Sequence, residues 1–365
     1  MTIVFLLVLV GLAFWGFTHL VLKGADLSAF DSPRPEMHGG RSEASPEHAA
    51  VVARVQKMQA GAGARESSSA RVVRVRRNLE EAFGDRAVDA EVRNVDAGGV
   101  PAQWVLAPGA DPDRRILYLH GGGFIAGSPK SHRPLTARLS ADNAAAVLSV
   151  DYRLMPENAR ADCPDDCCRA YEWILENGPD GSGAPDALFV GGDSAGGNLA
   201  LVVVAWARDL GHRAADAVIA FSPLTDSSYA SPSLRTNIAT DPMLGPLFKQ
   251  FGRVPHWLML WGSFFTMKGR PADPRFSPVY GDLAGLPPVL VQASASEVLT
   301  DDARRWVNKA RSAGTEATLQ LWPDVVHVFQ AFVPDLPEAD EALKEVQQFF
   351  EKHAPHQSRI SAKAS

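Results

Sequence analysis

This sequence of 365 residues contains few cysteines, and its basic residues do not outnumber its acidic residues. The three cysteines, Cys163, Cys167 and Cys168, fall within one stretch of six residues, so they cannot supply the spaced pairs of a disulfide framework. No Cys or His at finger-like spacing completes a set of metal ligands around them, and we expect buried, reduced thiols. With 36 Lys and Arg against 42 Asp and Glu, the formal net charge is −6, which argues against a nucleic-acid-binding surface.

Acidic residues, Lys and Arg are all absent from Ile3 to Leu22, "IVFLLVLVGLAFWGFTHLVL". A helix of this length would extend about 30 Å, the thickness of the hydrocarbon core of a bilayer. A cleaved signal peptide is the alternative, but a basic start and a small-x-small cleavage site are not evident. We therefore expect residues 1–24 to be an uncleaved membrane anchor. Basic residues follow the run and none precedes it, so the positive-inside rule predicts that the rest of the chain faces the cytoplasm.

The remaining chain has the composition of a packed globular protein, with 46% apolar and 21% charged residues. Residues 25–75, rich in Ser, Pro, Gly and Ala, are expected to form a linker and an N-terminal cap helix, "PEHAAVVARVQKMQA" (46–60). Residues 76–356 are expected to form the main domain, and residues 357–365 a disordered tail.

Short apolar runs alternate with helical segments along the main domain. Strands are predicted at 114–120, 144–152, 187–193, 217–224, 287–294 and 317–323, and helices at 130–141, 160–176, 195–210, 301–313 and 338–353. Nearly continuous apolar runs are typical of strands that are covered on both faces. The alternation therefore predicts an α/β fold around a mainly parallel sheet, which an antiparallel hairpin at 89–96 and 101–108 would open.

Residues 225–275 interrupt this alternation. They show no strand pattern but contain many large apolar side chains, which is unusual for a loop of this length. We expect a helical insertion that covers the edge of the sheet as a cap. A second membrane-associated segment is the alternative, and charged residues such as Lys249 and Lys268 disfavour it.

Two glycine-rich stretches could each suggest a phosphate site. "GGDSAGG" (191–197) has the glycine spacing of a P-loop, but Gly197 and Asn198 stand where Lys and Ser or Thr are required. "GGGFIA" (121–126) matches the glycines of a dinucleotide fingerprint, but "SPKSHRP" separates it from the next helix. Nucleotide binding is therefore disfavoured at both.

The first stretch instead matches the nucleophile elbow, Gly-x-Ser-x-Gly, with Gly192, Asp193, Ser194, Ala195 and Gly196. A serine on a sharp turn from strand to helix needs small neighbours two residues before and after it. The predicted strand before this stretch and the predicted helix after it supply that context. Ser194 is therefore our candidate nucleophile.

A serine nucleophile needs a base, and the base needs an orienting acid. In folds with this elbow the chain order is Ser, acid, His, and each residue follows a strand. His327 follows the predicted strand 317–323 and is the candidate base. Glu297 follows the strand 287–294 and is the candidate acid, with Asp301 as the alternative.

The segment "HGGGF" (120–124) follows an upstream strand and has the composition of an oxyanion loop. Backbone N–H groups of bare glycines can approach a tetrahedral intermediate closely. We assign Gly122 and Gly123 as donors, together with the N–H of Ala195. His120 and Gly121 are expected to shape the loop.

The motifs "LYLHGGGFIAGS", "VDYRLMPEN", "GGDSAGGNLA", "SASEVL" and "HVF" occur in this order. Between about residues 85 and 352 the sequence resembles the hormone-sensitive-lipase-like family of α/β-hydrolases, a group of carboxylesterases. The resemblance implies an eight-stranded, mostly parallel sheet with helices on both faces and a helical cap. It also implies a triad of Ser194, Glu297 and His327, a small-molecule ester as substrate, and no metal or organic cofactor.

The resemblance has departures. The family acid is most often Asp in an Asp-x-Leu pattern, where this chain has Glu297-Val298-Leu299, and Met155 replaces a usual alanine. An N-terminal membrane span is also not typical.

The expected function is hydrolysis of short- to medium-chain carboxylic esters. The alternatives are an amidase or lipid deacylase with the same triad, a non-catalytic small-molecule receptor, and a tethered interaction protein.

Overall fold

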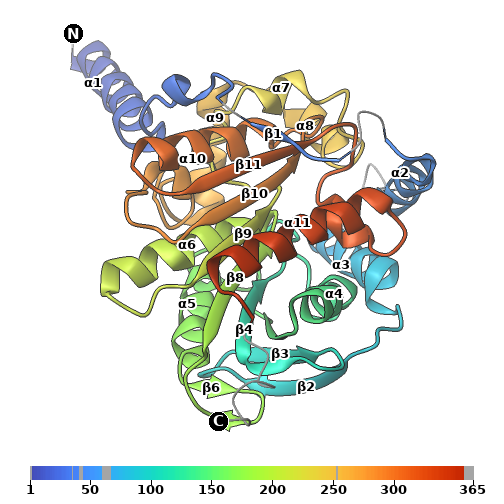
Figure 1. Ribbon diagram of the computed structural model, residues 1–365. Coiled ribbons are helices and arrows are strands. Elements are labelled where there is room, and N and C mark those ends of the chain that lie inside the picture. The colour runs from blue at the N-terminus through green and yellow to red at the C-terminus, as the bar shows by residue number, and fades with distance from the viewer. Residues whose placement is uncertain (1, 35, 41–43, 60–66, 252–253, 357–365) are drawn as a thin grey trace.

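The computed structural model describes residues 2–34, 36–40, 44–59, 67–251 and 254–356. The tail predicted at residues 357–365 lies outside this part of the chain. Figure 1 shows a twisted sheet in the middle of the molecule, with helices packed on both of its faces.

The sheet has the strand order β1-β11-β10-β9-β8-β4-β5-β3-β2. The strands from β1 to β5 in this order run parallel, and β3 and β2 add an antiparallel hairpin at one edge. Their bounds are β1 (Met37–His38), β2 (Glu91–Asp96), β3 (Pro101–Leu106), β4 (Asp111–Leu119), β5 (Ala145–Val150), β8 (Ala187–Asp193), β9 (Ala217–Phe221), β10 (Val289–Ser294) and β11 (Ala317–Trp322). The predicted parallel sheet and its opening hairpin are confirmed. A two-residue strand, β1, extends the sheet beyond the eight strands expected.

Two helical layers cover the sheet. One contains α5 (Asp162–Ile174), α6 (Ala195–Leu210) and α10 (Thr300–Ser312), and the other contains α4 (Arg133–Asn143) and α11 (Pro337–His353). Side chains of one strand reach both layers, since Leu188 and Val190 of β8 pack in the first layer and Phe189 in the second. This two-sided burial explains why the strands are apolar runs rather than alternating patterns. A separate small hairpin pairs β6 (Asn177–Gly178) with β7 (Gly181–Ser182).

The cysteines lie on α5. All three are free and buried, as predicted, and Cys163 and Cys167 belong to the hydrophobic core of the first layer.

Helices also form in the N-terminal region and in the interval 225–275. The N-terminal region contains α2 (Pro46–Gln59) and α3 (Ser68–Leu79). Sequence reasoning expected α2 but placed the α3 segment in a linker. The described part of 225–275 contains α7 (Ser233–Thr236), α8 (Gly245–Phe251) and α9 (His256–Met267).

The predicted membrane anchor is wrong. The first helix, α1 (Thr2–Gly16), has 15 residues, which corresponds to about 22 Å at 1.5 Å per residue. It continues into a π-helix, η1 (Phe17–Leu22), in which Thr18 and Leu22 are buried. Within the described residues, none of the helices has the length and apolar character needed to cross a membrane. The cytoplasmic-facing orientation that depended on such a span is withdrawn with it.

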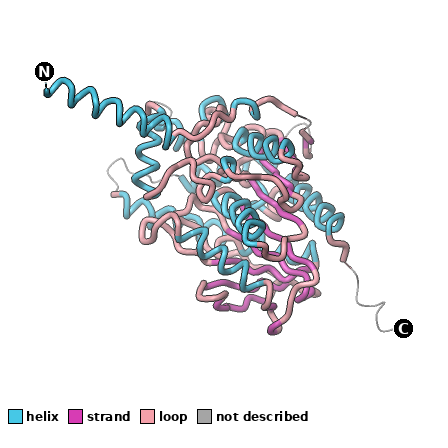
Figure 2. The backbone as a smooth tube through the Cα atoms, turned by 90° about the vertical axis from the view of Figure 1, so that its left-hand side faces the viewer, coloured by secondary structure: helices cyan, strands magenta, loops and turns pink. Residues whose placement is uncertain are grey.

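Contacts with the cap interval account for this arrangement. The Trp261 side chain of α9 donates a hydrogen bond from Nε1 to Thr18 Oγ1 at 2.9 Å and stacks on the Phe14 ring at a centroid distance of 5.0 Å. Phe17 packs edge-on against Phe264. The apolar run is therefore partly used for packing against α9, while the beginning of α1 projects from the domain (Figure 2).

Candidate active site

The turn after β8 holds Ser194 in a conformation that side-chain-bearing residues rarely adopt, with φ +52° and ψ −114°. Its N–H donates to Phe221 O at 2.7 Å, which ties the turn to the neighbouring strand β9. A Cβ atom on Gly196 would collide with the carbonyl oxygen of Leu119 in β4, so only glycine fits there. The predicted strand–turn–helix context of Ser194 is thus present.

His327 and Glu297 lie beside this turn. His327 Nε2 lies 3.0 Å from Ser194 Oγ, and His327 Nδ1 lies 3.0 Å from Glu297 Oε2. The three residues follow β8, β10 and β11, whose carboxyl ends meet at one edge of the parallel sheet. The structure therefore brings together the three side chains that the sequence suggested, although 133 residues separate Ser194 from His327.

The alternative acid, Asp301, is engaged elsewhere. One of its carboxylate oxygens accepts the backbone N–H of Ser233 at 2.8 Å, and the other pairs with Arg304. Glu297, in contrast, accepts a second hydrogen bond on Oε2, from Ser222 Oγ at 2.9 Å. Ser222 follows β9, and sequence reasoning missed it because serine after a strand carries no distinctive signal.

Burial and charge act together on the Glu297–His327 pair. Burial raises the pKa of Glu297, although the His327 ring and the Ser222 hydroxyl oppose that rise. Burial also disfavours a charged His327, but the Glu297 carboxylate, together with Asp241 and Asp193, outweighs it and raises the pKa of His327. The carboxylate thus stabilises a protonated imidazole, which is the state that a general base reaches after accepting a proton.

The glycine loop after β4 adopts backbone conformations that favour glycine, with φ +120° at Gly122 and φ +64° at Gly123. The N–H of Gly121 is used internally, because it donates to Asp193 Oδ1 at 3.1 Å. Ala195 is the first residue of α6, so its N–H precedes the first hydrogen bond within the helix. The loop and the helix start both lie at the carboxyl edge of the sheet.

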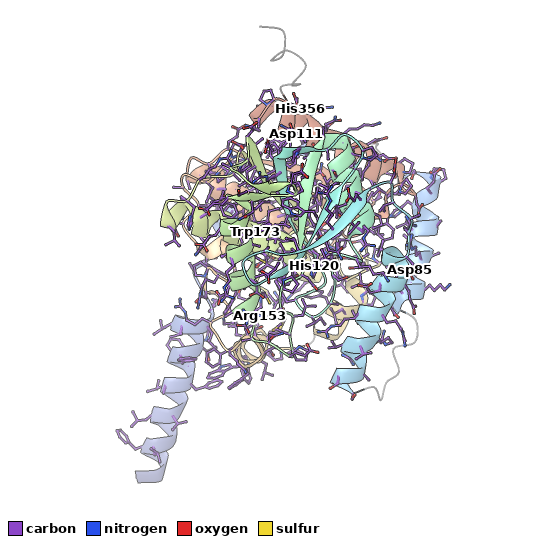
Figure 3. All side chains as sticks on the ribbon, turned by 90° about the horizontal axis from the view of Figure 1, so that it is seen from below. Asp85, Asp111, His120, Arg153, Trp173 and His356 are labelled. Atoms are coloured by element: carbon purple, nitrogen blue, oxygen red, sulfur yellow. The ribbon has the colours of Figure 1, made fainter. Side chains whose placement is uncertain are left out.

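His120 is buried behind this loop. Tyr152 donates from its hydroxyl to His120 O at 2.7 Å, and the two rings stack at a centroid distance of 4.3 Å. In Figure 3, His120 lies near the middle of the molecule, whereas Asp85 and His356 lie at its margin. His120 and Tyr152 therefore pack behind the glycine loop within the core.

Two further residues that sequence reasoning missed contact the same loop. The Arg160 guanidinium lies 3.5 Å from the centroid of the Phe124 ring and donates to Asn198 Oδ1 at 2.9 Å. Arg76 of α3 donates from Nε to Ile125 O at 2.7 Å. Neither position matched a motif, since both contacts depend on the folded arrangement.

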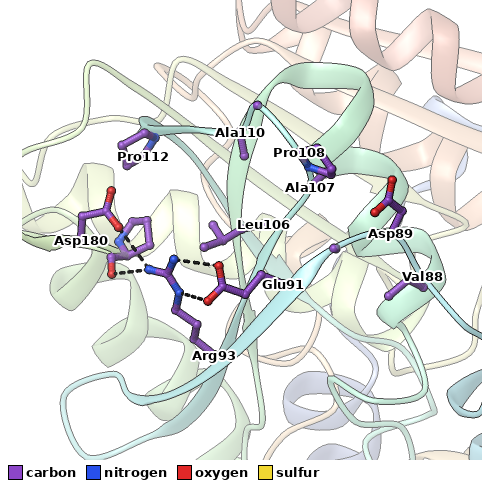
Figure 4. A pocket seen from close by; sticks show the side chains of 13 residues that line it. Val88, Asp89, Glu91, Arg93, Leu106, Ala107, Pro108, Ala110, Pro112 and Asp180 are labelled. Carbon is purple, nitrogen blue, oxygen red and sulfur yellow. Dashed lines mark hydrogen bonds and ion pairs between the residues drawn. The ribbon is translucent and has the colours of Figure 1, made fainter.

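A surface pocket of about 480 Å³ lies elsewhere, among residues of β2, β3 and the start of β4 (Figure 4). Within it, Arg93 pairs with Glu91 and with Asp180. The pocket adjoins the amino end of β4, whereas Ser194 follows the carboxyl end of the parallel strand β8. We therefore assign the pocket no part in the chemistry at Ser194.

Comparisons with known proteins agree with this fold. A sequence profile described as "alpha/beta hydrolase fold" matches residues 116–331. An acetyl-hydrolase of Streptomyces hygroscopicus is 36% identical over 266 residues, which cover 73% of this chain and 84% of that protein. The carboxylesterase/phospholipase LipF of Mycobacterium tuberculosis is 36% identical over 252 residues, which cover 68% of this chain and 65% of that protein.

Solved structures give the same result. The crystal structure of an esterase from the bacterial hormone-sensitive lipase family is similar, with a TM-score of 0.74 and 33% sequence identity. The match covers 86% of this chain and 99% of that one.

Proposed function

Because this chain belongs to the hormone-sensitive-lipase-like family of α/β-hydrolases, we propose that it cleaves short- to medium-chain carboxylic esters with a triad of Ser194, Glu297 and His327. Its class as a carboxylic ester hydrolase follows from the family and from relatives named acetyl-hydrolase, carboxylesterase and esterase. The proposal concerns the residues that carry the reaction and the length of the acyl chain.

In the first half of the reaction, His327 Nε2 accepts the Ser194 proton while Ser194 Oγ attacks the ester carbonyl. The 3.0 Å distance between these atoms supports the transfer. Glu297 accepts a hydrogen bond from Nδ1–H, keeps Nε2 directed at Ser194, and stabilises the imidazolium that forms. The alcohol leaves with the proton held by His327, and Ser194 retains the acyl group.

The oxyanion of the tetrahedral intermediate is bound by the N–H groups of Gly122, Gly123 and Ala195. Gly121 is not included because its N–H donates to Asp193. Each such donor is typically worth about 3 kcal/mol of transition-state stabilisation. In the second half, His327 activates a water molecule, which hydrolyses the acyl-enzyme and regenerates Ser194.

The range of acyl lengths is inferred from the cap. We assign residues 225–275 to a cap insertion and residues 25–75 to a linker and an N-terminal cap, which α3 extends to Leu79. Leu244 and Phe248 pack in one cluster with Val298, next to the acid, and Asp241 Oδ2 accepts the N–H of Val298 at 2.9 Å. An apolar cap anchored to the acid loop favours apolar acyl chains over charged substrates.

The observation that carries the proposal is the continuous set of contacts from Glu297 through His327 to Ser194. Hydrolysis of p-nitrophenyl esters from C2 to C12 tests it. We expect the highest kcat/KM at C2 to C8 and a rate for Ser194→Ala that equals the background. A maximum at C12 would contradict the acyl-length range, and equal rates for wild type and Ser194→Ala would contradict the nucleophile.

A lipid deacylase is the second candidate, because one relative is named a carboxylesterase/phospholipase. The same triad would then act on the acyl ester of a phospholipid. Fatty-acid release from dispersed phosphatidylcholine at a kcat/KM close to that for p-nitrophenyl esters would favour this candidate. Release at background level would leave the small-ester proposal.

A further inference from the structure

A buried ion pair lies behind the glycine loop and takes no part in the triad contacts. His132 precedes the first residue of α4, and its Nε2 lies 3.4 Å from Oδ2 of Asp193. The side chains of the two residues are 8% and 4% exposed. Asp193 immediately precedes Ser194, so this pair adjoins the candidate nucleophile along the chain.

The Asp193 carboxylate is fixed against the glycine loop. Its Oδ1 accepts the N–H of Gly121 at 3.1 Å and the hydroxyl of Tyr118 at 2.8 Å. A Cβ atom on Gly121 would collide with this carboxylate, so the loop and the carboxylate are in close contact. A displacement of Asp193 would therefore displace the loop that carries Gly122 and Gly123.

The position of this carboxylate raises an electrostatic problem. A buried negative charge beside the loop repels the oxyanion that forms during acyl transfer, and low polarity strengthens the repulsion. A cation on the far side of Asp193 would cancel most of that effect. His132 is the group placed to supply it.

The other groups that face His132 do not supply this charge. They are Tyr118 and His120 beside β4, and Glu80 near the end of α3. Burial and the neighbouring His132 lower the pKa of His120 to about 3, so His120 is neutral. Burial also disfavours a charged His132, but Asp193, with smaller contributions from the Ser128 carbonyl and Glu80, outweighs it and raises the pKa of His132.

The hydrogen bonds of His132 fit a doubly protonated ring. Nδ1 lies 3.0 Å from Ser131 Oγ and 3.3 Å from Ser128 O, and a carbonyl oxygen can only accept. Nε2 faces the Asp193 carboxylate, which accepts as well. Contacts on both ring nitrogens thus fix the orientation of His132. Ser128 itself is held by a hydrogen bond from its Oγ to Glu80.

We propose that His132 is a positioning residue: as an imidazolium paired with Asp193, it fixes the oxyanion loop and cancels the carboxylate charge beside the developing oxyanion. This proposal rests on the proposed function, because it acts on the oxyanion of ester hydrolysis. In addition to His327, the reaction thus depends on a second histidine, His132, which does not contact the substrate.

The test is His132→Gln, which keeps a hydrogen-bond donor and removes the charge. Since a direct oxyanion donor is worth about 10²–10³ in kcat, we expect a loss of roughly 10- to 100-fold in kcat and a KM within about threefold of wild type. Affinity for a trifluoromethyl ketone, which forms a tetrahedral adduct, should fall by the same factor as kcat. The control is His356→Gln, a histidine at the margin of the molecule in Figure 3, which should match wild type in every measurement.

A double variant separates the effect of the lost His132 charge from a structural effect of the substitution. In His132→Gln with Asp193→Asn both charges are absent, so the loss of kcat should be smaller than the product of the two single losses. Wild-type kcat should also decline at alkaline pH as His132 loses its proton, and this decline should be missing in the double variant. If His132→Gln does not fold, the pH profiles of wild type and the double variant decide the question.

The outcomes distinguish this proposal from the proposed function. If wild type is labelled at Ser194 by a fluorophosphonate but His132→Gln keeps wild-type kcat and ketone affinity, His132 is merely structural and the proposal is overturned. An alkaline decline that persists in the double variant would overturn it as well. If wild type itself is neither labelled nor active, the proposed function fails instead.

Discussion

Ser194, Glu297 and His327 are held by buried polar contacts at the ends of three parallel strands, whereas residues 2–22 contact α9 mainly through aromatic rings and one hydrogen bond from Trp261 to Thr18. In the first region, specific hydrogen bonds fix each polar side chain, and its position follows from the strand end that it adjoins. In the second region, apolar side chains can pack in many ways, and Phe5 and Trp15 are 66% and 58% exposed. We therefore expect substitutions in the first region to change kcat strongly and substitutions in the second region to change it little.

The largest effect is expected at Glu297. Glu297→Gln keeps the size of the side chain but removes the charge that stabilises the His327 imidazolium. We expect kcat to fall by about 10³–10⁴, the order found when the orienting acid of a serine protease is neutralised. The matched change Asp301→Asn should lower kcat less than tenfold, because Asp301 contacts Ser233 and Arg304 rather than His327. The reverse ranking, measured with a p-nitrophenyl ester, would assign the acid to Asp301.

The next effect concerns the glycine loop. Gly122→Ala puts a side chain on a residue with φ +120° and against the carbonyl oxygen of Ala126. We expect kcat to fall about 100-fold, as for the loss of one oxyanion donor. The control is Gly99→Ala, which strains a turn with φ +88° but meets open space, so that only stability should fall. Similar kcat losses in both variants would show that backbone strain, rather than the loop, is responsible.

The pH dependence of kcat/KM tests the pairing of His327 with Glu297 in the first region. His327 must be neutral to accept a proton, so kcat/KM should rise with pH through the pKa of His327. Glu297 raises that pKa above its ordinary value of 6.5, which places the midpoint above pH 6.5. In Glu297→Gln, burial lowers the pKa of His327 and the weaker attractions of the Asp241 and Asp193 carboxylates oppose it, so the midpoint of the residual activity should shift to lower pH. Stopped assays across pH 4 to 9 measure both midpoints, and a shift to higher pH would contradict the assignment.

The smallest effect on activity is expected in the N-terminal region. Trp261→Ala removes the hydrogen bond to Thr18 and the stacking on Phe14. Each contact is worth about 1 kcal/mol, so amide exchange over residues 2–22 should increase about tenfold or more, while kcat/KM stays within about threefold. Phe265→Ala on the exposed side of α9 serves as the control. Unchanged exchange in Trp261→Ala, measured by mass spectrometry, would show that α9 does not hold this segment.

The same contrast explains what could be predicted from the sequence. The strands were predicted because burial on both faces leaves apolar runs, and the elbow was predicted because Gly192 and Gly196 have no room for side chains. The positions of Glu297 and His327 followed from strand ends in the correct chain order. The choice between Glu297 and Asp301 did not, because both follow β10 closely, Glu297 in the turn after the strand and Asp301 in the first turn of α10.

Other features depend on tertiary contacts that leave little local signal. The α3 segment carries four arginines among its 12 residues, and Arg76 anchors it through Ile125 and Glu157. The strand β1 has two residues and pairs only with β11 among the described strands. The run from Ile3 to Leu22 looked like a membrane span because its packing on Trp261 cannot be read from composition. His132 lies 61 residues from Asp193, and no motif joined the two.

The central claim is that Ser194 is a nucleophile activated by His327 and Glu297. Fluorophosphonate labelling of wild type, Ser194→Ala and Glu297→Gln, followed by mapping of the modified peptide, tests it most directly. We predict stoichiometric modification of Ser194 in wild type, none in Ser194→Ala, and labelling of Glu297→Gln slowed by about 10³-fold or more. Modification of folded Ser194→Ala at the wild-type rate would contradict the account.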